Sequence, residues 1–231
     1  MSSRPDPTAR GAGGRHGGPW RAAGAAVVLL LAMVGSGLIG ASLNGDTVRP
    51  PQPVARAGTG PATPAAEVGT GDVDREPAGL PRSAPTTISI PRIGVDADIM
   101  ALGTNPDGSV QVPPLDQALL AGWYEPGPSP GEVGNAVIVG HVDSAAIGPA
   151  VFFSLGALQP GDIITVRRLD GRSADFRVDS VSSHSKNAFP TEQVYGPNDQ
   201  PGLRVITCGG QFDEATGDYL DNVIVFASLV R

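Results

Sequence analysis

The sequence has very little cysteine, lysine and histidine: its 231 residues include one cysteine, one lysine and three histidines. A single cysteine cannot form a disulfide within the chain, so Cys208 is either a free thiol or bonded to another chain. The Cys, His and carboxylate residues lack the spacing of a zinc site, and the acidic residues at 213–221 lack the order of an EF-hand loop. No glycine-rich phosphate loop opens a helix. These absences predict that the protein requires no metal and no other cofactor.

Positive charge is also scarce over residues 87–231, where 17 acidic side chains stand against 8 basic ones. An excess of negative charge repels the phosphate backbone of DNA and RNA, so nucleic acid is not expected as a partner. The abundance of Ala, Gly, Pro and Arg is typical of a GC-rich bacterial genome and says nothing about mechanism.

Residues 22–43, AAGAAVVLLLAMVGSGLIGASL, carry no charge. A helix of this length covers the hydrocarbon layer of about 30 Å, so a single transmembrane anchor in the lipid bilayer is expected here. Residues 1–21 form an arginine-rich tail and no basic cluster follows the run, which predicts a cytoplasmic N-terminus and an extracytoplasmic C-terminal part. A cleaved signal peptide, with small residues at 40–42, and a buried soluble helix are the alternatives.

The next segment, residues 44–86, is dominated by Pro, Ala, Gly and Thr and has almost no large apolar side chain to bury. Such a composition predicts a disordered linker, which would separate a folded domain from the membrane. The folded domain is then expected at residues 87–231.

The pattern of residues 87–231 is that of short strands separated by turns. Helical periodicity is weak, and only 151–158 shows any. Closely spaced strands with few helices predict a mostly β domain, either a small barrel or a sandwich. The expected strands are β-branched stretches bounded by Gly, Pro, Asp or Asn, at 88–90, 93–95, 136–139, 163–166, 176–178, 203–206 and 223–226.

Two residues at strand ends could carry chemistry. Cys208 follows the apolar stretch 203–206 and precedes two glycines, and His141 follows the expected strand at 136–139. A thiolate nucleophile needs a proton donor to expel an amine, so a cysteine and a histidine at neighbouring strand ends are a minimal acyl-transfer pair. The alternative for Cys208 is a buried structural cysteine. The remaining histidines lie in the N-terminal tail (His16) and in a serine-rich stretch expected to be a loop (His184).

These motifs resemble the sortase family. The resemblance runs over residues 88–227, and its most specific part is a Gly-His pair followed about 65 residues later by Thr-Cys, each after a β-branched strand. It also includes the segments ISIPRIGV (88–95), NAVIVGHVD (135–143), VITC (205–208) and VIVFA (223–227). The Thr-Cys-Gly-Gly form and the Asp221-Asn222 pair look closest to actinobacterial class F sortases.

The resemblance implies a closed eight-stranded β-barrel with short helices, and a cysteine transpeptidase. In such an enzyme Cys208 would attack the Thr-Gly bond of an LPXTG-like sorting signal and form a thioacyl-enzyme. An amine, from a cell-wall (peptidoglycan) precursor or a pilin, would then take the acyl group. His141 would serve as the acid for the leaving amine and the base for the incoming one.

The sequence departs from the family at a catalytic arginine near the start of the last strand. Asn222 occupies that position, and the nearest arginine is Arg204, which shares strand parity with Cys208. Asn222 could donate a hydrogen bond but no charge, and Arg204 could reach the site from the same face. A turn-capping asparagine and a solvated arginine are the alternatives, and Arg92 or Arg231 could instead supply the guanidinium.

Two further residues are candidates beside the pair. Thr207 could offer its backbone or its hydroxyl to the acyl group, or serve only in strand pairing. Asp143 could orient the imidazole of His141, or stand in a turn. For the whole domain, a cysteine peptidase that uses water as acceptor and a catalytically inactive peptide-binding barrel remain alternatives to the transpeptidase.

Overall fold

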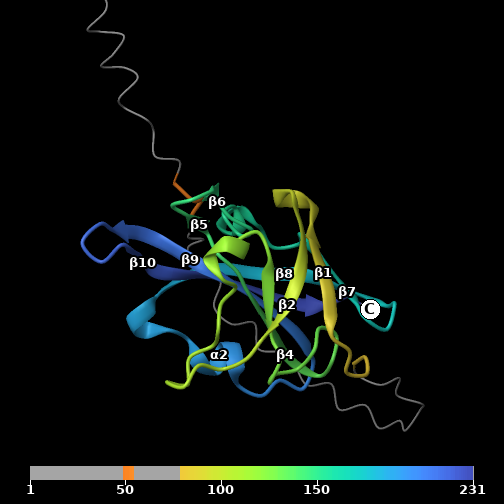
Figure 1. Ribbon diagram of the computed structural model, residues 1–231. Coiled ribbons are helices and arrows are strands. Elements are labelled where there is room, and N and C mark those ends of the chain that lie inside the picture. The colour runs from red at the N-terminus through yellow and green to blue at the C-terminus, as the bar shows by residue number, and fades with distance from the viewer. Residues whose placement is uncertain (1–48, 55–78, 231) are drawn as a thin grey trace, which may run out of the picture. The chain divides into compact units, whose positions relative to one another are not determined.

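A computed structural model describes residues 49–54 and 79–230 of the chain (Figure 1). The expected tail (1–21) and the expected transmembrane anchor (22–43) lie outside these ranges and stay predictions. Within the described ranges, no helix combines the length and the apolar composition needed to cross a membrane.

The domain is built around a closed barrel, in the strand order β1-β2-β3-β4-β9-β10-β8-β7, which confirms the expected eight-stranded fold. Two neighbouring pairs, β2 with β3 and β4 with β9, are parallel, and the other pairs are antiparallel. A separate two-stranded ladder joins β5 (Asp143–Ser144) and β6 (Gly148–Pro149). The barrel strands are β1 (Pro85–Ile90), β2 (Val95–Leu102), β3 (Ala121–Tyr124), β4 (Gly134–Val139), β7 (Ile163–Arg168), β8 (Ser173–Ser185), β9 (Pro201–Asp213) and β10 (Asp218–Leu229).

Helices are short in the described part of the chain. The weak helical pattern at 151–158 corresponds to turns followed by the 3-10 helix η3 (Leu155–Ala157). The other helices are η1 (Pro91–Ile93), η2 (Leu115–Gln117), η4 (Lys186–Ala188) and the single-turn helix α2 (Thr191–Tyr195).

Apolar side chains lie on both faces of the sheet around β4, β9 and β10. Residues Ala136 and Ile138 point into the barrel core, whereas Val137 and Val139 point outward, because side chains alternate along a strand. The outward residues belong to a second cluster, here called the outer apolar cluster: Leu102, Val137, Val139, Val194, Ile206 and Ile224, with Met100, Tyr124, Phe189 and Phe226 packed against it. Both faces of this region are therefore partly apolar.

Strand β8 is much longer than the sequence predicts. The expected strand covers 176–178, but β8 continues to Ser185 and includes His184, which the serine-rich composition placed in a loop. The reason is tertiary pairing, because β10 pairs with β8 along residues 176–185 and supplies its backbone hydrogen bonds. The prediction of a loop at His184 is therefore wrong.

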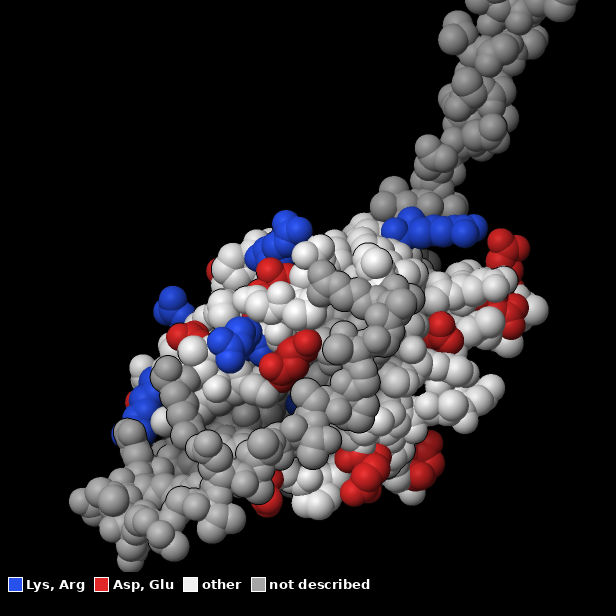
Figure 2. All heavy atoms as spheres, turned by 180° about the vertical axis from the view of Figure 1, so that it is seen from behind, with Lys and Arg blue, Asp and Glu red and all other residues white. Residues whose placement is uncertain are grey.

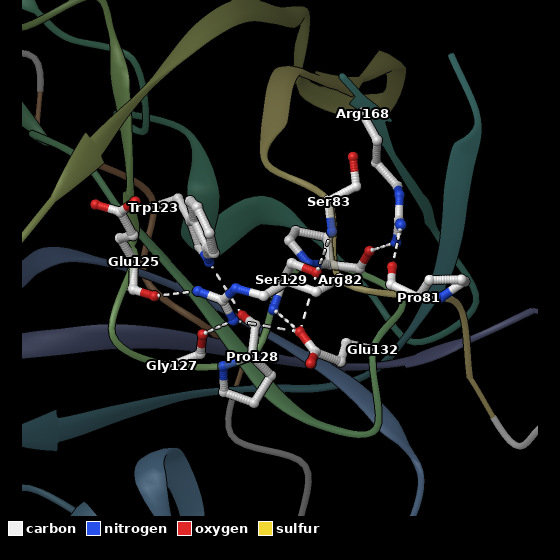
Figure 3. A network of polar contacts seen from close by, with 11 residues as sticks. Pro81, Arg82, Ser83, Trp123, Glu125, Gly127, Pro128, Ser129, Glu132 and Arg168 are labelled. Atoms are coloured by element: carbon white, nitrogen blue, oxygen red, sulfur yellow. Dashed lines mark hydrogen bonds and ion pairs between the residues drawn. The ribbon is translucent and has the colours of Figure 1, made fainter. Parts of the chain in front are cut away.

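The residues that precede β1 are attached to the barrel, although the expected linker extends to residue 86. Arg82 donates hydrogen bonds to the carbonyl oxygens of Glu125 (2.6 Å) and Gly127 (2.8 Å), and its guanidinium lies 5.2 Å from the ring centroid of Trp123 (Figure 3). Arg168, whose side chain is buried, donates to the carbonyl of Pro130 at 2.5 Å and also to that of Pro81. The described structure thus continues upstream of residue 87.

Candidate active site

The end of β4 runs beside the middle of β9, which continues to Asp213, and this brings two sequence motifs together. These parallel strands are in register from Gly134 opposite Pro201 to Val139 opposite Ile206. The contact continues beyond β4, because the N–H of Gly140 donates to the carbonyl of Ile206 at 3.1 Å. The hydroxyl of Thr207 then donates to the carbonyl of Gly140 at 2.8 Å. Thr207 of β9 therefore holds the residue that follows β4 with its side chain.

A predicted catalytic residue comes next in each of these two segments. His141 follows Gly140, and Cys208 follows Thr207. The register of the two strands, continued by two residues, places His141 beside Cys208. Neighbouring strands are about 4.8 Å apart, so adjacent positions on them are close in space. Both side chains are half-buried, which leaves them open to a substrate.

The imidazole of His141 is held by a backbone carbonyl. Its Nε2 lies 2.6 Å from the carbonyl oxygen of Pro113. A carbonyl oxygen only accepts, so Nε2 carries a hydrogen, and in the neutral ring Nδ1 is the nitrogen with the lone pair. The backbone of His141 is fixed as well, since its carbonyl accepts from the N–H of Phe152 at 3.0 Å. The ring can therefore exchange a proton at Nδ1 while Nε2 stays anchored.

Asp143 has a different partner from the one the sequence suggested. Its carboxylate accepts a hydrogen bond from the hydroxyl of Tyr219 on β10, while His141 is bonded to Pro113. Burial, and then the neighbouring carboxylate of Asp143, raise the pKa of the Tyr219 phenol well above its usual range, so the phenol stays protonated and keeps donating. Asp143 thus ties β5 to β10 near the site.

Asn222 stands directly across from the nucleophile. On β10 it pairs with Cys208 of β9 on one side and with His184 of β8 on the other. Side chains opposite each other on antiparallel strands have Cβ atoms about 5 Å apart, so the amide of Asn222 is a neutral hydrogen-bond donor beside the sulfur.

The side chain of Arg204, the other candidate for the role of the catalytic arginine, forms its hydrogen bonds away from Cys208. It donates to the carbonyl of Gln193 in α2 at 3.0 Å and to that of Leu203 at 3.1 Å, and its guanidinium lies 4.9 Å from the ring centroid of Phe226. It precedes Cys208 by four residues on the same strand, roughly 13 Å along β9. The structure places Arg204 at the far end of this face, against α2.

The electrostatic surroundings of Cys208 have opposing effects. Burial raises the pKa of the thiol, and the carboxylates of Asp218 and Asp143 raise it further. Lys186 lowers it, both through its positive charge and through a side-chain hydrogen bond to Cys208. The thiol is therefore in an environment that disfavours the thiolate, apart from this one ammonium.

The model of the sortase domain family matches residues 88–230. The chain belongs to the sortase family. It is accordingly a sortase-type cysteine transpeptidase.

Several solved sortase structures are similar to this sortase. A Clostridium perfringens sortase D5 transpeptidase is 26% identical, with 64% of this chain and 79% of that chain covered and a TM-score of 0.48. Sortase C-1 from Actinomyces oris is 19% identical over 63% of this chain and 73% of that chain, with a TM-score of 0.48. Sortase A from Corynebacterium diphtheriae is 21% identical over 65% of this chain and 62% of that chain, with a TM-score of 0.46. No curated protein sequence matches the chain.

The two glycines that follow the nucleophile of this sortase are required by their surroundings. A Cβ atom at Gly209 would collide with the side chain of Val223 on β10, and one at Gly210 would collide with the carboxylate of Asp221. Gly210 also has a positive φ of 78°, which glycine adopts without strain. The segment 49–54 approaches here too, because the side chain of Gln52 accepts from the N–H of Gly210 at 2.9 Å.

Sequence reasoning missed three contributors to the site: Lys186, Tyr219 and the carbonyl of Pro113. Lys186 has one signal in the sequence, since it is the only lysine of the chain. The other two have none, because each reaches the site through a contact between distant strands or loops. No group of three or more potential metal ligands is found within 49–54 and 79–230.

Proposed function

We propose that this sortase cleaves an LPXTG-like sorting signal between Thr and Gly and transfers the threonyl group to an amine of a cell-wall precursor or a pilin. The observation that carries the proposal is the register of β4 with β9, which continued by two residues puts His141 beside Cys208, together with the hydrogen bond from the Thr207 hydroxyl to the Gly140 carbonyl. Cys208 attacks the threonyl carbonyl carbon, and the C–N bond to glycine breaks. His141 protonates the leaving amine and later takes a proton from the acceptor amine that attacks the thioester.

The outer apolar cluster supports a peptide substrate. It covers the outward face of β4, β9 and β10 on the same side as Cys208, since Ile206 and Cys208 share strand parity. Four of its members, Met100, Tyr124, Phe189 and Phe226, are only partly buried and offer apolar surface to a chain laid along the sheet. We assign this face to the apolar residues of the sorting signal.

The proposal also covers the cellular location and the membrane topology of this sortase. The uncharged run at 22–43 and the arginine-rich tail before it support a single-pass anchor in the cell membrane, a cytoplasmic N-terminus and an extracytoplasmic catalytic domain. The Thr-Cys-Gly-Gly motif and the Asp221-Asn222 pair support a relation to actinobacterial class F sortases.

On the face shown in Figure 2, acidic and basic side chains are dispersed and intermixed.

The experiment is mass spectrometry of the full-length chain incubated with an LPXTG peptide and an amine acceptor, either a diglycine or a diaminopimelate-type compound. A ligated product that disappears in Cys208→Ala supports the transpeptidation. A hydrolysed product alone, at saturating acceptor, would mean that water is the acceptor and that the enzyme acts as a peptidase. Peptide binding without any product or adduct at Cys208 would instead identify a binding barrel.

A further inference from the structure

The nucleophile belongs to a row of side chains that crosses three neighbouring strands. Asn222 on β10 lies between Cys208 on β9 and His184 on β8 and pairs with both. Lys186 follows directly after the end of β8, as the first residue of η4, and its ammonium reaches Asp218 at the start of β10, the strand that pairs with Cys208. His184 and Lys186 are half-buried, while the serine before each of them is exposed.

The ammonium of Lys186 is held in place by a carboxylate. Its Nζ lies 2.7 Å from both oxygens of Asp218, the first residue of β10. The carboxylate is itself fixed, since it accepts from the backbone N–H of Tyr219 at 2.8 Å. The side chains of Lys186 and Asp218 are 31% and 57% exposed, so water still reaches the pair. The ammonium therefore has a defined position at the end of the row.

Among the described residues, the other charged and titratable groups near Cys208 do not supply a second permanent cation, and His141 becomes positive only when it takes the thiol proton. The carboxylates of Asp143, Asp218 and Asp221 are negative. Arg204 is directed to the carbonyl of Gln193. The remaining groups around the site have partners of their own: His141 with Pro113, Tyr219 with Asp143, His184 with Ser182, and Asp221 with Ser183. Among the residues that the structure describes, Lys186 is the lysine or arginine that acts on the thiol.

We propose that Lys186 is a catalytic residue of this sortase, which stabilises the negative charge of the Cys208 sulfur and then of the substrate oxyanion, and that Asp218 positions it. The inference rests on the proposed function, in that Cys208 is taken as the nucleophile.

The chemistry requires a cation at this place. A half-buried thiolate facing carboxylates is unfavourable, and an opposite charge within hydrogen-bond reach offsets that cost. The thiol proton passes to His141, and Lys186 keeps its own proton throughout. When sulfur attacks the carbonyl carbon, the negative charge moves to the carbonyl oxygen, where the three donors of an ammonium on a flexible stem can follow it. Asn222, at the position expected for an arginine, offers only neutral donors.

The test uses the alkylation of Cys208, the single cysteine, by iodoacetamide in the full-length chain, followed by intact mass at several pH values. Lys186→Met should raise the midpoint of the rate profile and slow alkylation near pH 7 by about five- to tenfold, since one pKa unit corresponds to a tenfold change in thiolate. Lys186→Arg, which keeps the charge, should lose less than about threefold. Asp218→Asn should accelerate alkylation by about two- to fivefold, because it removes a negative charge near the thiol, and this effect outweighs the looser position of the ammonium.

Lys186→Met and Asp218→Asn are expected to change the alkylation rate in opposite directions, which distinguishes an electrostatic role of the pair from a structural one. If the pair only stabilised the fold, Lys186→Met and Asp218→Asn would change alkylation in the same direction, and the proposal would be wrong. Arg177→Met is the matched charge control, because Arg177 is an exposed residue of β8, far along the strand from Lys186, and its alkylation profile should equal that of the wild type. An unchanged profile in Lys186→Met would also overturn the proposal.

Chemical modification of the lysine in the folded chain avoids the risk that a substituted chain does not fold. Acetylation of the folded wild-type chain removes the charge of its one lysine, and alkylation should then slow as much as in Lys186→Met. The same reagent applied to Lys186→Met reports the contribution of the N-terminal amine, which should be nil. In the peptide assay, Lys186→Met should lower kcat more than it changes KM. Alkylation needs no peptide turnover, so a failure of the proposed substrate leaves this test intact.

Discussion

At the scale of single residues, the thiol of Cys208 is governed by burial. Burial raises its pKa, and Lys186 offsets part of this effect. The folded-state pKa is thus above the ordinary thiol value, so the thiol form dominates at neutral pH and the thiolate grows only as the pH rises through the raised pKa. We expect the rate of iodoacetamide alkylation in the folded chain to have a midpoint above that of the same chain unfolded in guanidinium chloride.

The unfolded chain is a direct reference, because its only cysteine is then solvated. Stopped-time alkylation between pH 6 and pH 11 gives both midpoints. A folded midpoint at or below the unfolded one would show that the effect of the Lys186 cation on the thiol pKa outweighs that of burial.

Local sequence pointed to the predicted catalytic pair, whereas it did not reveal the surroundings of the pair. His141 lies just beyond the end of β4, as expected, but the prediction that Cys208 stands at a strand end is wrong, because β9 continues to Asp213 through its pairing with β10. The partners of His141 and Asp143 could not be read in this way. Pro113 and Tyr219 are 28 and 76 residues away from them in sequence, and only the folded barrel brings these groups into contact.

At the scale of elements, β9 and β10 separate two candidate residues for the arginine role. Asn222 lies opposite Cys208, while Arg204 joins β9 to α2 and to Phe226. We expect Asn222→Ala to lower kcat about tenfold with little change in KM, since it removes a donor beside the reacting sulfur. Arg204→Met should instead raise KM several-fold with kcat nearly unchanged, because it loosens α2 beside the apolar face.

Steady-state kinetics with the ligation assay measures both variants side by side. The two are matched, since each removes one polar group from the same face of the sheet. If Arg204→Met abolished kcat while KM stayed constant, Arg204 would be the residue that acts on the oxyanion, and its position in the ground state would not be the catalytic one.

The strands were predictable where burial alternates and unpredictable where pairing alone makes the strand. In β8, buried Ala174, Phe176 and Val178 alternate with exposed neighbours, and this part was recognised at 176–178. The segment from Asp179 to Ser185 is polar, and its pairing with β10 makes it a strand. The positions of His184 and Lys186 depend on that extension, so no local pattern predicts that they lie near Cys208.

At the scale of the whole molecule, the start of the domain is secured by a buried arginine. The side chain of Arg168 is fully buried at the end of β7 and donates to the carbonyls of Pro130 and Pro81 (Figure 3). Asp170 is its ionic partner. These bonds connect β7, the loop before β4 and the segment before β1. The guanidinium beside Asp170 holds the pKa of that carboxyl below its usual range, so the pair is charged at neutral pH.

Arg168→Met should therefore lower the free energy of unfolding by about 3 kcal/mol, because two carbonyl groups lose their donor while the cavity stays filled. The neighbouring Arg167 is exposed, and Arg167→Met should change stability by less than about 0.5 kcal/mol. Urea unfolding of both variants measures the difference. The alkylation rate of Cys208 in folded Arg168→Met should equal that of the wild type, since the network does not include the site. Equal stability of the two arginine variants would mean that the segment before β1 is held mainly by Arg82 and its contacts with Trp123 and Glu125.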